Sequence, residues 1–76
     1  MATIIRDARV IRRLIRCRKT QRYFDGDGWT FDPNTARSFD HAIDAARACV
    51  DNKLESVDLV LQLPEAPAEL FSTFLR

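Results

Sequence analysis

The chain has 76 residues, 46% of them hydrophobic, which fits one small folded domain over residues 1–76 and leaves no room for a second core. Its 12 basic and 11 acidic side chains nearly balance, and it contains one His, two Cys and no glycine-rich phosphate loop. These numbers exclude a disulfide-rich scaffold and argue against an enzyme, so we expect no catalytic residues and no cofactor.

The N-terminal residues predict neither a targeting signal nor a membrane segment. Arg6 and Asp7 interrupt the apolar residues before they reach the length that a secretory signal requires. The longest apolar stretches of the chain have three residues, far fewer than a membrane span needs. We therefore expect a cytoplasmic protein with no membrane partner, in which Cys17 and Cys49 are reduced and buried. The spacing of these thiols from His41 does not match a zinc site, so we expect no metal.

Charge is distributed unevenly along the chain. Residues 1–22 carry eight basic side chains, seven of them Arg, against one acid, whereas residues 23–76 carry four basic side chains against ten acids. Such asymmetry is typical of a nucleic-acid surface, because Arg pairs with phosphate through two parallel hydrogen bonds. It also fits a small domain whose basic and acidic halves pack together. We favour this second interpretation, because the near-zero net charge weakens long-range attraction.

Residues 11–18 predict a β-strand because their apolar side chains alternate with basic ones. The two faces of that strand carry Ile11, Arg13, Ile15 and Cys17, and Arg12, Leu14, Arg16 and Arg18. Residues 19–21 form a turn, and residues 22–24 begin the returning strand of a hairpin. The alternative is a helix over residues 3–16, since apolar residues also recur there at helical spacing. For residues 2–9 the sequence fits either a helical turn or a further strand.

Residues 25–28, Asp-Gly-Asp-Gly, predict the clearest turn of the chain, because Asp and Gly tolerate positive φ angles. A short extended segment follows over residues 29–31, and a helical turn capped by Asp32 follows over residues 32–36. The acids of this region do not match a calcium loop. Such a loop requires an oxygen ligand where Trp29 stands and glycine where Thr30 stands.

The second half of the chain predicts two helices and one strand. The main helix covers residues 40–53, with Ser38 or Asp40 as its cap and Asn52 at its end. A strand follows over residues 57–63. The apolar face of the helix consists of Ala42, Ile43, Ala45, Ala46, Cys49 and Val50, and that of the strand of Val57, Leu59, Leu61 and Leu63.

A final helix is predicted from Pro67 to about Leu75, because Pro is favoured in the first helical turn. The sequence as a whole therefore predicts an α+β fold. Its sheet is small, antiparallel or mixed, and has about three strands, with the main helix packed on one face and a C-terminal helix added.

Between residues 18 and 63 the chain contains a Tyr-Phe pair, a Gly-Trp-Thr triplet, an Ala followed three residues later by Phe, and a helix with paired alanines. The residues that carry this pattern are Tyr23, Phe24, Gly28, Trp29, Thr30, Asp32, Ala36, Phe39, Ala42, Ala45 and Ala46. In this pattern the chain resembles a group of small uncharacterised bacterial and phage proteins. The resemblance implies a shared fold unit, with Trp29 in the core and with Ala36 and Phe39 seating the helix. It implies no established activity.

Two binding functions are consistent with the sequence. A C-terminal apolar stripe either covers the sheet or docks into a partner protein, and a second copy of the chain is one candidate partner. The stripe consists of Leu70, Phe71, Phe74 and Leu75. Our leading hypothesis is therefore a non-enzymatic interaction or accessory module that acts by protein binding.

The alternative is a nucleic-acid-binding domain, in which guanidinium groups and an aromatic ring on an open sheet face stack on single-stranded bases. Its candidate residues are Arg12, Arg16, Arg18, Arg22 and Tyr23. If the arginines of the first strand pair with acids of the same chain, this alternative loses its support.

Overall fold

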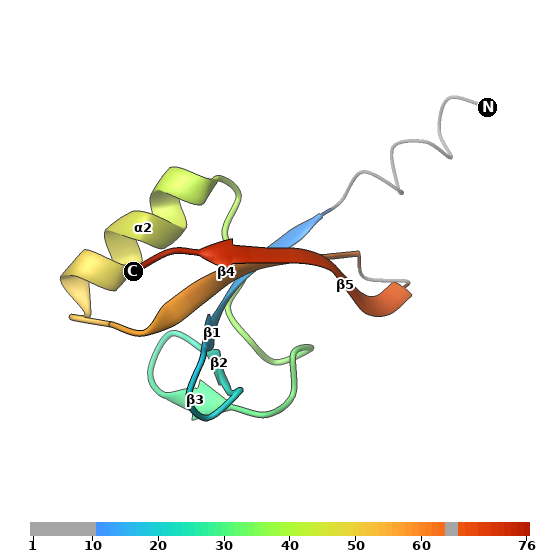
Figure 1. Cartoon of the computed structure of the whole chain (residues 1–76), viewed down its shortest axis with the longest axis horizontal. Helices are drawn as coiled ribbons and strands as arrows, with labels where there is room; N and C mark the ends of the chain where they lie inside the picture. Colours follow the sequence, from blue (N-terminus) through green and yellow to red (C-terminus); the bar gives the residue numbers. More distant parts are fainter. Residues whose placement is uncertain (1–10, 64–65) are drawn as a thin grey trace.

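The computed structural model of this chain describes residues 11–63 and 66–76, and at Leu63 and residues 66–71 it describes the main chain alone. Over these residues the chain forms one antiparallel sheet of five strands and one helix, so the predicted α+β class is confirmed (Figure 1). The elements are β1 (Arg12–Cys17), β2 (Tyr23–Phe24), β3 (Trp29–Thr30), α2 (Ala42–Asp51), β4 (Val57–Leu63) and β5 (Ala66–Phe74). The strands lie in the order β3-β2-β1-β4-β5.

The centre of the sheet is the pairing of β1 with β4. Leu14 lies opposite Val60, and Ile15 lies opposite Leu59. Because successive side chains of a strand point to opposite faces, the burial of both Leu14 and Ile15 means that both faces of the sheet are covered here.

The predicted strands over residues 11–18 and 57–63 are confirmed by β1 and β4. The alternative helix over residues 3–16 is wrong for residues 12–16, which lie in β1. The open question about residues 2–9 lies outside the described residues.

Each face of the sheet has its own hydrophobic cluster. The larger one, on the side of α2, consists of Ile15, Phe24, Phe39, Ala45, Cys49, Val57 and Leu59. The smaller one, on the other face, consists of Leu14, Ala36 and Val60, with Tyr23 packed against it. Phe39 therefore seats the helix as expected. Ala36 does not, because it packs on the opposite face of the sheet.

The loop before Ala36 is held over that second face by Arg12. The Arg12 guanidinium donates from Nη1 to the carbonyl of Pro33 at 2.6 Å and from Nη2 to the carbonyl of Ala36 at 2.9 Å. These two hydrogen bonds tie the loop to β1, and the Pro33 carbonyl also accepts the main-chain amide of Ala36 at 3.3 Å. Arg12 therefore does not stand on an open sheet face, where the nucleic-acid hypothesis placed it.

The turn between β2 and β3 forms as predicted. The Asp25 carboxylate accepts hydrogen bonds from the main-chain amides of Asp27 at 2.9 Å and Gly28 at 2.6 Å, while Gly26 has a φ of 101°. Trp29, expected in the core, is 38% exposed, because β3 has two residues and lies at the edge of the sheet. The Trp29 ring packs edge to face against Phe24.

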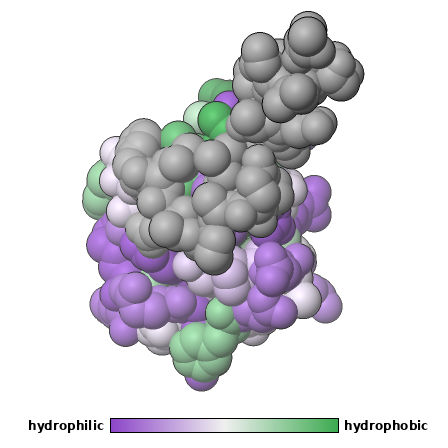
Figure 2. Space-filling view, turned by 90° about the vertical axis from the view of Figure 1, so that its right-hand side faces the viewer, coloured by the Kyte–Doolittle hydropathy of each residue, from purple (hydrophilic) through white to green (hydrophobic). Residues whose placement is uncertain are grey.

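The end of the molecule at which β3 lies has an exposed hydrophobic patch within a hydrophilic surface (Figure 2). Phe31, which directly follows β3, is 67% exposed. The Arg22 guanidinium lies 4.7 Å from the centroid of its ring. This arrangement is a surface contact and adds nothing to either hydrophobic cluster.

The main helix begins two residues later than predicted. Its N-cap is His41, whose side chain makes no capping hydrogen bond, so the predicted caps Ser38 and Asp40 are wrong. The helix ends at Asp51, two residues before the predicted bound of 53, and Asn52 closes it as predicted, since Asn52 Nδ2 donates to the carbonyl of Ala48 at 2.9 Å. Within the described ranges, the structure contains no helix whose length and hydrophobicity would suffice to cross a membrane.

The helix packs through small side chains rather than through its largest apolar ones. Ala45 and Cys49 are buried, whereas Ile43 and Val50, predicted on the same buried face, are each 63% exposed. The reason is that Phe39 already fills part of the space above the sheet. A helix can therefore approach closely only with its alanine and cysteine side.

The predicted C-terminal helix is wrong, because residues 66–74 form strand β5. Pro67 at a first-turn position favours a helix, but β4 offers an unpaired strand edge to the segment that follows it. Pairing along that edge satisfies the main chain, and it overrides the weak local preference. Together with the two-residue strands β2 and β3, this gives five strands instead of about three.

Candidate interaction surface at the edge of the sheet

Strand β5 is the long outer edge of the sheet, since it pairs with β4 on one side and ends the strand order. Leu75 donates its main-chain amide to the carbonyl of Val57 at 3.2 Å, and Thr73 lies opposite Leu59. Because main-chain groups of successive residues point to opposite sides of a strand, those of Ser72 and Phe74 point away from β4. No strand within residues 11–63 and 66–76 pairs with this outer side of β5.

The two halves of β5 differ as an edge. Natural edge strands avoid unwanted pairing by means of proline, charged residues and bulges. The first half of β5 has Pro67 and Glu69, and its pairing with β4 is irregular between Leu61 and Leu63. The second half, residues 72–74, is regularly paired and contains no charged residue or proline. Ser72, Thr73 and Phe74 are exposed there, and we call these three residues the β5 edge.

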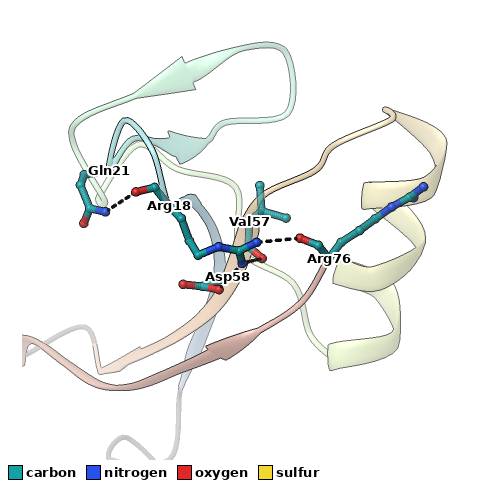
Figure 3. Close-up of polar contacts among 5 residues, drawn as sticks. All are labelled: Arg18, Gln21, Val57, Asp58 and Arg76. Atoms are coloured by element: carbon teal, nitrogen blue, oxygen red, sulfur yellow. Dashed lines mark hydrogen bonds and ion pairs between the residues drawn. The ribbon is translucent and has the colours of Figure 1, made fainter.

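Arg18 holds the end of β5 in place (Figure 3). Its Nη1 donates to the Val57 carbonyl at 2.8 Å and to Asp58 Oδ1 at 2.6 Å, and its Nη2 donates to the Arg76 carbonyl at 3.3 Å. Its guanidinium also lies 4.8 Å from the centroid of the Phe74 ring. One side chain thus connects the β1–β2 turn with β4 and with the residues that follow β5.

The turn that carries Arg18 is itself fixed locally. Gln21 adopts a left-handed conformation with a φ of 66°, and its Nε2 donates to the main-chain carbonyl of Arg18 at 3.0 Å (Figure 3). The ion pair with Asp58 is half exposed, with 37% and 17% of the two side chains accessible. Such a pair stabilises a fold modestly, so Arg18 acts mainly through its hydrogen bonds to carbonyls.

The five residues predicted for nucleic-acid binding do not form one free surface. Arg12 binds the loop carbonyls, Arg18 binds β4 and the residues after β5, and Tyr23 packs in the smaller cluster. Arg16 is half-buried and lies opposite Tyr23 and Asp58 in the sheet. Arg22 is exposed over Phe31.

The predicted protein-interface stripe is divided by the change from helix to strand. Phe74 is 71% exposed, whereas Leu75 packs against the larger cluster. The side chains of Leu70 and Phe71 lie outside the described part of the chain. Of the predicted interface residues, the structure thus presents Phe74 on the β5 edge.

Sequence reasoning missed Asp58 and Ser72. Asp58 lies with Val60 and Gln62 on the face of β4 opposite to that of Val57. It pairs across the sheet with Arg16 of β1. A basic residue in one strand and an acidic residue in the other were therefore a usable signal. Ser72 had no such signal, because its role depends on a strand that the sequence predicts as a helix.

The two thiols differ in environment, and both are free. Burial raises the pKa of Cys49, which confirms its predicted place in the core. A hydrogen bond from the Thr20 side chain lowers the pKa of Cys17, which is half-buried rather than buried as predicted. His41 is exposed, and no group of three possible metal ligands occurs in the part of the chain that the structure describes.

Comparison with known proteins found no matching family model, no matching curated protein and no matching solved structure. The resemblance to the group of small bacterial and phage proteins therefore stays a prediction.

Proposed function

We propose that this chain is a small interaction module that acts by binding protein, rather than by catalysis, and that its partner at the β5 edge is a second copy of itself. The observation that carries the proposal is the position of β5 as the long outer strand, with the main-chain groups of Ser72 and Phe74 pointing away from the sheet. A strand from another molecule binds such an edge by extending the sheet. A cytoplasmic location belongs to the same proposal.

Three features favour a second copy as the partner. Two antiparallel β5 strands related by a two-fold axis present the same surface to each other, so one contact satisfies both copies. The net charge of +1 gives little repulsion between them. Finally, each Phe74 ring, 71% exposed in the single chain, lies where the second copy would cover apolar surface.

The nucleic-acid alternative receives less support from the contacts of its residues. The guanidinium groups of Arg12 and Arg18 already donate to carbonyls of the chain. The exposed Arg22 lies beside Phe31, close in sequence to three acids, Asp25, Asp27 and Asp32. Titration of labelled single-stranded RNA at several salt concentrations is expected to show no binding with the salt dependence of phosphate contacts.

The test of the proposal is the mass of the protein in solution. Ser72→Pro removes the outward main-chain amide, and proline is tolerated on an edge strand where the amide faces solvent. Light scattering with size-exclusion chromatography should give twice 8.8 kDa for the wild type and for the control Ser72→Ala. It should give a single chain for Ser72→Pro, with an unchanged circular dichroism spectrum.

Two results would overturn the proposal. One is a wild-type protein that stays monomeric at concentrations up to about 1 mM, the weak end of specific association. The other is a folded Ser72→Pro variant that still forms the dimer, which would place the contact elsewhere.

A further inference from the structure

A second surface, separate from the β5 edge, is a cleft between α2 and the segment over residues 37–40. Its volume is about 530 Å³, within the range of sites that bind small molecules and short peptides. Phe24 and Phe39, both nearly buried, line its apolar part together with Ala48. The cleft therefore combines an apolar floor with open polar walls.

Charges of both signs line the two walls. Asp44, Arg47 and Asp51 belong to α2, and Arg37 and Asp40 belong to the opposite segment. Among the described residues, these five side chains make no hydrogen bond or ion pair with one another or with the rest of the chain. Opposite charges in one cleft that do not neutralise each other suit a ligand that carries both charges.

Arg37 is held in position without being paired. Its guanidinium lies 5.5 Å from the centroid of the Phe39 ring, an attraction that restrains the side chain, and its donors have no acceptor within residues 11–63 and 66–76. Gly26 lies beside it, and a Cβ at that position would be in van der Waals contact with Arg37 Cδ at 3.4 Å. A donor group restrained in this way loses less entropy when it binds a carboxylate.

We infer that this cleft binds an extended peptide segment in which a basic, an acidic and a second basic side chain alternate with small residues. Asp44 and Arg47 are about 4.5 Å apart along the helix axis, and Arg47 and Asp51 are about 6 Å apart. Side chains on one side of an extended peptide recur about every 6.6 Å, which the long side chains of Lys and Glu can match. The acid of the peptide pairs with Arg47 and Arg37, and its two bases pair with the aspartates.

The charge balance supports the same ligand. Two arginines and three aspartates leave the cleft one unit negative, which a peptide with two bases and one acid neutralises. The cleft does not involve the β5 edge, so this inference does not depend on the proposed dimer.

The test uses a capped, fluorescently labelled Lys-Ala-Glu-Ala-Lys peptide and its charge-inverted form, Glu-Ala-Lys-Ala-Glu, in anisotropy titrations of the full chain. We expect the first peptide to bind about tenfold more tightly than the second, the effect of one charge-assisted hydrogen bond. Arg47→Gln should weaken its binding about tenfold. The matched control Lys19→Gln removes an exposed positive charge outside the cleft and should leave binding unchanged.

The Arg47 variant separates this site from general attraction. Loss of Arg47 makes the protein more negative, so non-specific attraction of a basic peptide would become stronger. Tighter binding by Arg47→Gln, equal binding of the two peptides, or no binding up to about 1 mM would each overturn the inference. Ser72→Pro should bind the first peptide as the wild type does, and this outcome distinguishes the cleft from the β5 edge.

Discussion

The two edges of the sheet are built in opposite ways. At one edge, β3 has two residues and follows a turn that the Asp25 carboxylate closes. At the other edge, β5 has nine residues, and no strand of the described residues pairs with its outer side. Exposed aromatic rings occur at both edges, so exposure does not distinguish them. The two edges differ in the length of strand that a partner can pair with.

An arginine lies over an aromatic ring at each edge, and here too the surroundings decide the role. Arg22 lies 4.7 Å from the Phe31 centroid, and its side chain makes no hydrogen bond within the described part of the chain. Arg18 lies 4.8 Å from the Phe74 centroid and also donates to two main-chain carbonyls. The Arg22–Phe31 pair near β3 is therefore a surface contact, whereas the Arg18–Phe74 pair at β5 is part of the fold.

The largest expected effect tests which main-chain groups of β5 face outward. Thr73→Pro removes an amide that pairs with β4 and should lower the free energy of unfolding by about 3 kcal/mol. Ser72→Pro, one residue away, should lower it by less than about 1 kcal/mol, because its amide faces solvent. Urea denaturation measures both at a concentration where the protein is monomeric. Equal losses would show that the alternation along β5 is wrong.

The second prediction compares the two arginines. Arg18→Ala should lower the free energy of unfolding by about 2 kcal/mol, because the carbonyls of Val57 and Arg76 lose a charged donor. Arg22→Ala should lower it by less than about 0.5 kcal/mol, the usual range for an exposed residue. Chemical denaturation of both variants against the wild type gives the values. A loss of similar size for both would remove the distinction between the edges.

The third prediction concerns the turn at the β3 edge and its dependence on pH. Hydrogen bonds from the amides of Asp27 and Gly28 lower the pKa of Asp25 below its ordinary value of 3.8. A lowered carboxyl pKa stabilises the fold above that ordinary value, and the contribution is lost as the pH falls through the folded-state pKa. The urea midpoint of Asp25→Ala should therefore lie below that of the wild type at pH 7, and the difference should shrink below pH 3.8.

Asp27→Ala is the control for this prediction, because the Asp27 carboxylate makes no hydrogen bond or ion pair among the described residues. Its urea midpoint should follow that of the wild type over the whole pH range. If the difference for Asp25→Ala persists unchanged in acid, the carboxylate is not the source of the stabilisation.

The smallest expected effect is on the reactivity of the Cys17 thiol, at the junction of β1 with the turn toward β2, and not on stability. Cys17 should react with iodoacetamide faster than Cys49, because the Thr20 hydrogen bond lowers the pKa of the Cys17 thiol while burial raises that of Cys49. Thr20→Ala should slow alkylation of Cys17 at about pH 8, since less of the thiol is then ionised. Mass spectrometry of the alkylated peptides measures both rates, and faster labelling of Cys49 would contradict the described core.

Local patterns predicted the parts of the fold that depend on neighbouring residues in the chain. The alternation of β1 and β4, the Asp-Gly turn and the capping of α2 by Asn52 are confirmed for this reason. The side of α2 that packs, the exposure of Trp29 and the strand β5 could not be predicted in this way. Each depends on a surface built by distant residues.

The sequence by itself thus determined the α+β class, the two central strands and the main helix, because burial of alternating or helically spaced apolar residues is a local requirement. Only the tertiary structure decided that residues 66–74 extend the sheet, that Arg18 connects three segments, and that Arg37 and Arg47 line one cleft. An unpaired strand edge, carbonyls of separate segments within reach of one guanidinium, and a gap beside a helix exist only after the chain has packed, and no window of neighbouring residues contains them.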